Sequence, residues 1–102
     1  MRNAQHNNFL SMAENLISVL INKFKYLLDK ESIDMIKHYL DHSEYEMAFE
    51  GLFIELMNVN AVLTKTEIET YYNLGLKLEL DKESVFDSNF WCNFMTYMKH
   101  TS

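Results

Sequence analysis

The chain contains no proline and only two glycines, Gly51 and Gly75. Sandwiches and barrels of β-strands need many tight turns, and tight turns rely on the special backbone angles of these two residue types. Long helices joined by a few short connections need far fewer of them. Apolar residues make up 48% of the 102 residues, which is ample material for a core. We therefore predict an all-α protein with a single domain over residues 1–102, folded as a compact bundle of about five helices, mostly antiparallel.

Polar and apolar residues recur every three or four positions along most of the chain, as amphipathic helices require. The break Asp41–Glu44 is very short, and helices joined so tightly usually pack as an antiparallel hairpin. The five predicted helices cover about residues 8–28, 30–42, 44–58, 65–80 and 84–99.

Side chains that can cap free backbone amides mark three of the predicted helix starts. Asp29 is the expected N-cap of the second helix. Thr64 and Glu67 have the spacing of a capping box at the start of the fourth helix, and Ser84 and Asp87 form a weaker box for the fifth.

The third predicted helix is apolar almost all round, which is typical of a helix that contacts neighbours on several sides. We expect it to be the central helix of the bundle. Ala48 and Gly51 lie three residues apart within it, and their small side chains predict a close approach by a neighbouring helix. The alternative for Gly51 is a tolerated glycine that costs about 1 kcal/mol relative to alanine.

Patterns typical of catalytic, cofactor and metal sites are weak in this sequence. Cys92 has no histidine at helical spacing to activate it, so we interpret it as a small buried apolar residue. Asp34, His38 and His42 are four residues apart and could share a metal, but the further ligands of a helical zinc motif are missing. A solvated helix face explains them better. We expect no enzyme activity, no cofactor and no metal site.

Fifteen acidic residues outnumber nine basic ones, and the formal net charge is −6. Attraction to phosphate drives nucleic-acid binding, so direct binding of nucleic acid is not expected. The apolar residues near the N-terminus are interrupted by charged and amide side chains, unlike a signal peptide or a membrane span. A single cysteine gives no sign of an oxidising compartment. We expect a cytoplasmic protein that does not contact membranes.

The acidic residues are concentrated in one part of the sequence. From His38 to Thr64 there is no lysine or arginine, while five acidic residues fall in this interval. Such a surface would attract a basic partner, although an ordinary solvated surface explains the pattern about equally well. A tyrosine beside the acids could supply an apolar contact. The predicted partner-binding residues are Asp41, Glu44, Tyr45, Glu46, Glu50 and Glu55.

The segment His38–Glu50, within the wider range Ser32–Leu56, resembles the helix–tight turn–helix segment of small immunity proteins from bacterial polymorphic toxin systems. In that segment a helix with an acidic or amide tip leads directly into an acidic, alanine-containing apolar helix. It is similar to the MafI-like and CdiI immunity proteins, the latter from contact-dependent growth inhibition. The resemblance implies a partner, namely the C-terminal nuclease domain of a cognate toxin, which often acts on tRNA.

A nuclease needs a basic surface to hold phosphate, so an acidic protein could neutralise it by covering its active-site cleft. Stoichiometric occlusion of this kind is the function we expect. The alternative is a small helical adaptor or regulatory subunit unrelated to toxins. A small metal-binding protein ranks third. A helix-turn-helix DNA-binding protein ranks fourth, because its recognition helix would carry acidic residues towards phosphate.

Overall fold

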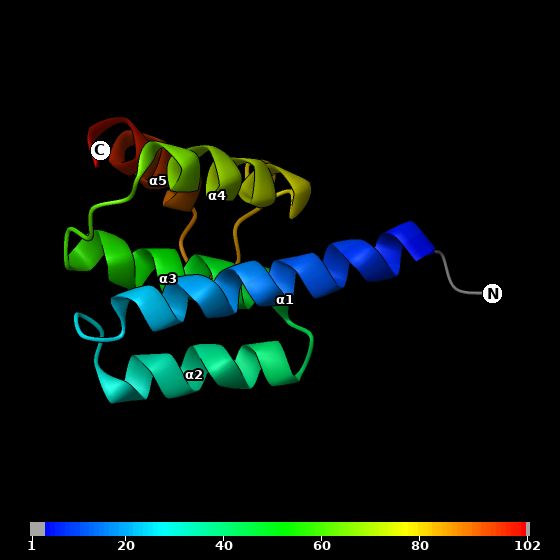
Figure 1. Ribbon diagram of the computed structural model, residues 1–102. Coiled ribbons are helices and arrows are strands. Elements are labelled where there is room, and N and C mark those ends of the chain that lie inside the picture. Colours follow the sequence, from blue (N-terminus) through cyan, green and yellow to red (C-terminus); the bar gives the residue numbers. More distant parts are fainter. Residues whose placement is uncertain (1–3, 102) are drawn as a thin grey trace.

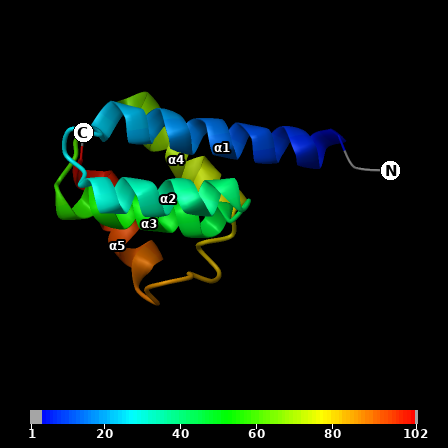
Figure 2. The same cartoon turned by 90° about the horizontal axis from the view of Figure 1, so that it is seen from below.

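The computed structural model describes residues 4–101, with side chains from residue 8 onward, and it confirms the predicted all-α bundle (Figures 1 and 2). Helices α1, α2 and α3 pack against one another, and α4 and α5 lie on the side of α3 away from α2. None of the helices in the described range is both long enough and apolar enough to cross a membrane. The helix bounds are α1 Ala4–Phe24, α2 Lys30–Asp41, α3 Tyr45–Asn58, α4 Lys65–Lys77 and α5 Phe90–His100.

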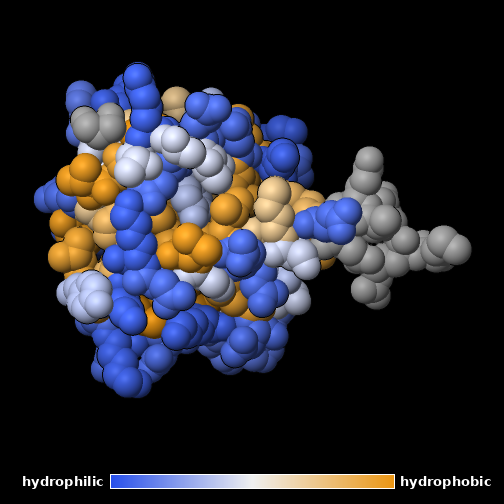
Figure 3. Space-filling model, viewed as in Figure 1, coloured by the Kyte–Doolittle hydropathy of each residue, from blue (hydrophilic) through white to orange (hydrophobic). Residues whose placement is uncertain are grey.

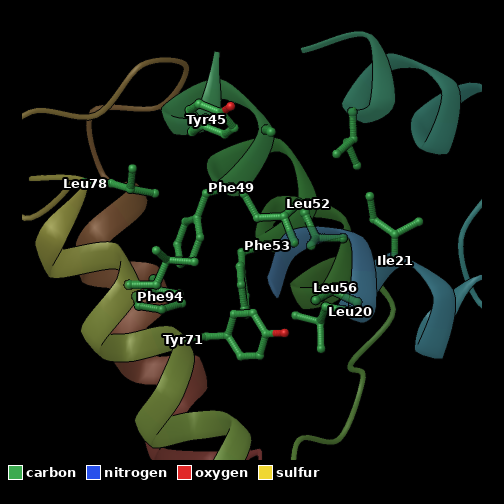
Figure 4. Packing of buried hydrophobic residues seen from close by; sticks show 14 of the residues in the cluster. Leu20, Ile21, Tyr45, Phe49, Leu52, Phe53, Leu56, Tyr71, Leu78 and Phe94 are labelled. Atoms are coloured by element: carbon green, nitrogen blue, oxygen red, sulfur yellow. The ribbon is translucent and has the colours of Figure 1, made fainter. Parts of the chain in front are cut away.

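Helix α3 occupies the centre of the bundle, as its apolar composition predicts. It packs against α1, α2 and α5. Leu52 and Leu56 point towards α1, whereas Phe49 and Phe53 point towards the aromatic side chains of α4 and α5 (Figure 4). All four of these side chains are completely buried. Because burying one such side chain contributes about 1.5–3 kcal/mol, these contacts with α3 are a main source of the stability of the fold.

The predicted starts of α2 and α4 are confirmed by their caps. The Asp29 carboxylate accepts a hydrogen bond from the Ser32 backbone N–H at 2.8 Å. In the capping box of α4, the Thr64 N–H donates to Glu67 Oε1 at 2.8 Å and the Glu67 N–H donates to Thr64 Oγ1 at 3.2 Å. These local signals depend only on residues three positions apart, so the sequence is sufficient to locate them.

The predicted end of α1 was wrong, since the helix stops at Phe24 instead of continuing to Leu28. The Leu27 N–H donates to the Phe24 carbonyl at 2.9 Å, which closes a turn. The turn directs Leu28 into the core, while Leu27 is 51% exposed. The free energy gained by burying Leu28 beside the start of α2 therefore exceeds the free energy gained by continuing the helix.

Three helices end in the same type of backbone turn without using glycine. The residues with positive φ are Ser43 after α2, Asn60 after α3 and Glu79 after α4, at 58°, 54° and 61°. In each turn the next amide reaches back to a carbonyl five residues earlier; the Leu80 N–H, for example, donates to the Gly75 carbonyl at 3.1 Å. This is the Schellman arrangement, in which glycine is the usual residue at the left-handed position. The turn also ends α4 at Lys77, three residues before the predicted end.

Tyr71 and Glu67 join α4 to α1. The Tyr71 hydroxyl donates to the Leu16 carbonyl at 2.6 Å, and burial raises the pKa of Tyr71 to about 12, so the donor stays protonated. Lys23 Nζ lies 2.7 Å from Glu67 Oε2. Partial burial opposes ionisation of Glu67, but the bonds from Lys23 and Thr64 outweigh it and hold the pKa of the Glu67 carboxyl below its ordinary value.

A buried carboxylate holds the connection between α4 and α5 in place. Glu50, in the middle of α3, is completely buried. Its Oε1 accepts the Val85 N–H at 2.7 Å, and its Oε2 accepts the N–H groups of Phe86 and Asp87 at 2.8 and 2.9 Å. The connection between α4 and α5 is thereby held against α3. We call this set of three hydrogen bonds the Glu50 clamp.

The predicted start of α5 at Ser84 was wrong. Residues 84–89 are not helical, and the amides of residues 85–87 bind the Glu50 carboxylate. The Asp87 side chain accepts the Asn89 N–H at 2.9 Å instead of forming a capping box with Ser84. Helix α5 starts only at Phe90.

The glycine that permits close packing is Gly75 and not Gly51, which corrects the prediction for Gly51. A Cβ atom built at Gly51 would meet its nearest neighbours at 3.7–3.9 Å, an ordinary contact distance. At Gly75 the same atom would lie 2.8 Å from Trp91 Cζ3 and 3.3 Å from Phe49 Cζ. The Trp91 ring is also packed against Phe94, with ring centroids 4.9 Å apart, so it has little freedom to move.

We predict that Glu50→Gln lowers the free energy of unfolding by about 2 kcal/mol, because an amide nitrogen would face an N–H donor in either orientation. Glu50→Ala should cost about 3 kcal/mol, since it leaves all three amides without their acceptor. Urea unfolding measures both changes. The exposed Glu46→Gln is the control and should stay within about 0.5 kcal/mol of the parent protein. A Glu50→Gln protein as stable as that control would contradict the structural importance of the clamp.

We predict effects of opposite sign for the two glycines. Gly51→Ala should stabilise the protein by about 0.5–1 kcal/mol, because alanine favours the helix and its methyl group fits. Gly75→Ala should destabilise it by about 1–2 kcal/mol, because the methyl group would overlap the Trp91 ring. Thermal and urea unfolding of the two variants side by side test this. Equal effects at both positions would show that the ring of Trp91 adapts.

Candidate protein-binding surface

Four glutamates from two distant parts of the chain line one hollow at the surface. Glu44 and Glu46 come from the start of α3, and Glu79 and Glu83 come from the connection after α4. The hollow has a volume of about 650 Å³. We call it the acidic cleft; its lining also includes Ser43 and Val85.

The negative potential of the acidic cleft has two sources. None of its lining residues, all of which belong to the described part of the chain, is lysine, arginine or histidine. The cleft also lies where α2 and α4 end and α3 begins, because Ser43 and Glu79 each lie two residues after a helix and Glu44 is the N-cap of α3. The carboxyl end of a helix carries a partial negative charge of roughly half an electron, and the amino end a partial positive charge of the same size. Two carboxyl ends against one amino end leave a net partial negative charge, which adds to the charge of the glutamates.

One lysine partly offsets this charge. Lys82 Nζ lies 3.2 Å from Glu79 Oε1. Both side chains are well exposed, at 71% and 68%, and an ion pair this exposed is worth at most about 1 kcal/mol. A basic side chain of a partner can therefore compete with Lys82 for Glu79 at low cost.

The structure brings together only some of the predicted partner-binding residues. Asp41 is exposed at the end of α2, Glu46 is exposed on α3, and Glu44 is half-buried between them. Glu55 is half-buried and nine residues beyond Glu46, about two and a half helical turns, which places it on the opposite side of α3.

Two of the predicted partner-binding residues are not on the surface at all. Tyr45 is 8% exposed and belongs to the core, where Figure 4 shows its ring beside Leu78 and Phe49. Glu50 is buried by the α4–α5 connection and holds it in place. Both predictions were wrong for the same reason: chain from after α4 covers this part of α3.

Sequence reasoning missed Glu79 and Glu83 in the acidic cleft. Three acidic residues between positions 79 and 83 were a visible signal. They lie beside Glu44 and Glu46 because the α4–α5 connection folds back over α3. Local sequence patterns do not predict the path of that connection.

An apolar groove lies on the other side of the Glu50 clamp. It is formed between α2 and α3, has a volume of about 210 Å³, and Phe86 is part of its lining. Met35, Ile54 and Glu55 also line it. Val85 lines the acidic cleft and Phe86 lines the apolar groove, so adjacent residues separate the two hollows. Elsewhere, on the face viewed in Figure 3, apolar side chains are interspersed with polar ones.

The other candidates for chemistry are separate from this surface. The His38 and His42 rings lie 4.2 Å apart, and His42 Nδ1 is 2.9 Å from the His38 carbonyl oxygen. Asp34 is paired with Lys30 at 2.8 Å. Within the part of the chain that the structure describes, no group of three potential ligands is arranged to hold a metal ion.

Cys92 is exposed, so the prediction that it is a buried apolar residue was wrong. The buried side of α5 is formed by Phe90, Phe94 and Met98. Cys92 lies two residues from both Phe90 and Phe94, which is the opposite side of the helix.

Comparisons of the chain with models of known protein families, with curated proteins and with solved structures gave no match.

Proposed function

We propose that the chain is an immunity protein, which binds the nuclease domain of a cognate bacterial toxin and neutralises it by stoichiometric occlusion in the cytoplasm. The observation that carries this proposal is the acidic cleft, which four glutamates line and whose lining includes no basic residue. The similarity of Ser32–Leu56 to immunity proteins of contact-dependent growth inhibition systems supports the same function.

A nuclease that acts on RNA presents a basic surface to phosphate. The acidic cleft offers carboxylates to the same lysine and arginine side chains, so the protein and the RNA would compete for one site. Surface charges of opposite sign also accelerate association, in a manner that weakens as salt is added. Binding at this cleft would exclude RNA without any catalytic group on the immunity protein.

Charge reversal at the acidic cleft tests the proposal. The double variant Glu46→Lys with Glu83→Lys should bind the inactivated C-terminal domain of the toxin encoded directly upstream at least about 30-fold more weakly, mainly through slower association. Both side chains are exposed, so the helical fold should remain intact. Calorimetric titration measures the affinity, and an RNase assay of the active toxin domain measures protection.

The matched control is Glu31→Lys with Glu69→Lys, which makes the same change in net charge at exposed positions on α2 and α4. It should retain nearly the parent affinity. Equal loss in the two double variants would mean that net charge matters and the cleft does not. No binding by the folded parent protein would contradict the immunity function for that pair and favour the adaptor function.

A further inference from the structure

We propose that Phe86, held by the Glu50 clamp, is the apolar anchor of this surface, and that the apolar groove beside it receives one large apolar side chain from a basic segment of the partner protein. This inference rests on the proposed function for the basic character of the partner. It specifies where on the surface the partner would bind and which kind of side chain would enter the groove.

Two consecutive apolar residues are exposed in the segment that the Glu50 clamp holds. Val85 is 46% exposed and Phe86 is 45% exposed. Single exposed apolar residues are common on protein surfaces and do not by themselves indicate a binding site. These two, however, have their backbone amides bound to a carboxylate that is completely buried. A buried charged group is costly unless its hydrogen bonds are satisfied, so the clamp holds the backbone of this segment against α3 at three consecutive amides.

The apolar groove beside Phe86 is large enough for an apolar side chain. The Phe86 ring lies 5.8 Å from the Tyr39 ring and about 3.9 Å from the position that a Gly51 Cβ would take. Phe86 thus contacts α2 and α3 and also lines the groove. The volume of about 210 Å³ exceeds the roughly 150 Å³ of an apolar cavity known to hold a benzene ring. Met35, which is 55% exposed, forms another part of the wall.

Negatively charged residues lie around the groove and favour a partner segment with basic residues. Glu55 is part of the lining of the groove, and the acidic cleft begins on the other side of Val85. An apolar side chain that enters the groove would therefore be flanked by carboxylates on both sides. The matching partner segment has one aromatic or leucine side chain with lysine or arginine neighbours. An apolar centre with a polar rim is the usual composition of protein interfaces, and a rigid anchor lowers the entropy lost on binding.

A direct probe of the groove is an acetylated and amidated hexapeptide in which two lysines flank each side of a tryptophan–leucine pair. Amide chemical-shift titration should show saturable changes at Met35, Ile54 and Phe86. Phe86→Ala should weaken peptide binding at least fivefold, and Met35→Ala provides a second variant of the groove wall. The same peptide with glutamates in place of lysines should bind at least tenfold more weakly. The control variant Val62→Ala removes an apolar side chain that is 65% exposed and lines a different hollow, so it should have no effect.

Glu50 is tested as a positioning residue with Glu50→Gln under conditions where the variant remains fully folded. Hydrogen exchange of the amides of residues 85–87 should accelerate, and peptide affinity should fall at least threefold with unchanged helix content. A purely structural role would lower stability and leave the affinity of the folded protein unchanged.

The results separate this inference from the proposed function. Shifts scattered over the surface, or Phe86→Ala binding the peptide as well as the parent protein, would overturn the anchor. A toxin domain that binds the parent and Phe86→Ala proteins equally would also overturn it and leave the immunity function standing. A peptide that binds in the groove while the toxin domain does not bind would support the anchor and contradict the toxin as the partner.

Discussion

The Glu50 carboxylate connects the middle of the central helix to the backbone of residues 85–87 through three hydrogen bonds of 2.7–2.9 Å. Much of the outer structure depends on this contact. It holds the α4–α5 connection over part of α3, where Glu79 and Glu83 lie beside Glu44 and Glu46. It also fixes Val85 and Phe86 between the acidic cleft and the apolar groove. A residue that resembles a surface acid in the sequence therefore organises the candidate site from inside.

The negative surface of the protein is concentrated where helices end. An acidic stripe along one helix would present charge over a long, uniform face. Here the ends of α2 and α4 meet the start of α3. The partial negative charges of the two carboxyl ends exceed the partial positive charge of the one amino end, and the difference adds to the charge of the glutamates. The resulting cleft is compact and lies next to an apolar hollow. This combination suits a protein partner with clustered basic residues around an apolar side chain.

Local signals in the sequence were sufficient for most of the fold. The absence of proline predicted the fold class, and caps three residues apart located the starts of α2 and α4. The burial of Glu50 comes from a contact between distant residues, because Glu50 lies 35 residues from Val85 in the sequence. The early ends of α1 and α4 come instead from local turns, whose hydrogen bonds join residues three to five positions apart.

The candidate site was predicted only in part, because it depends on contacts between distant residues. Glu44 and Glu46 belong to the cleft, as an unneutralised acidic interval indicates. Tyr45 and Glu50 are buried, although their neighbours in sequence are acidic and accessible. Helical spacing alone does not report which turn of α3 another segment covers. Glu79 and Glu83 could be assigned to the same site only with the path of the α4–α5 connection.

The most direct test of the account is hydrogen–deuterium exchange of the protein alone and with the inactivated nuclease domain of the neighbouring toxin. Binding should slow amide exchange in residues 43–47 and 79–87, where the acidic cleft and the Glu50 clamp lie. Slower exchange confined to another surface, such as the outer side of α4, with these two segments unchanged, would contradict it.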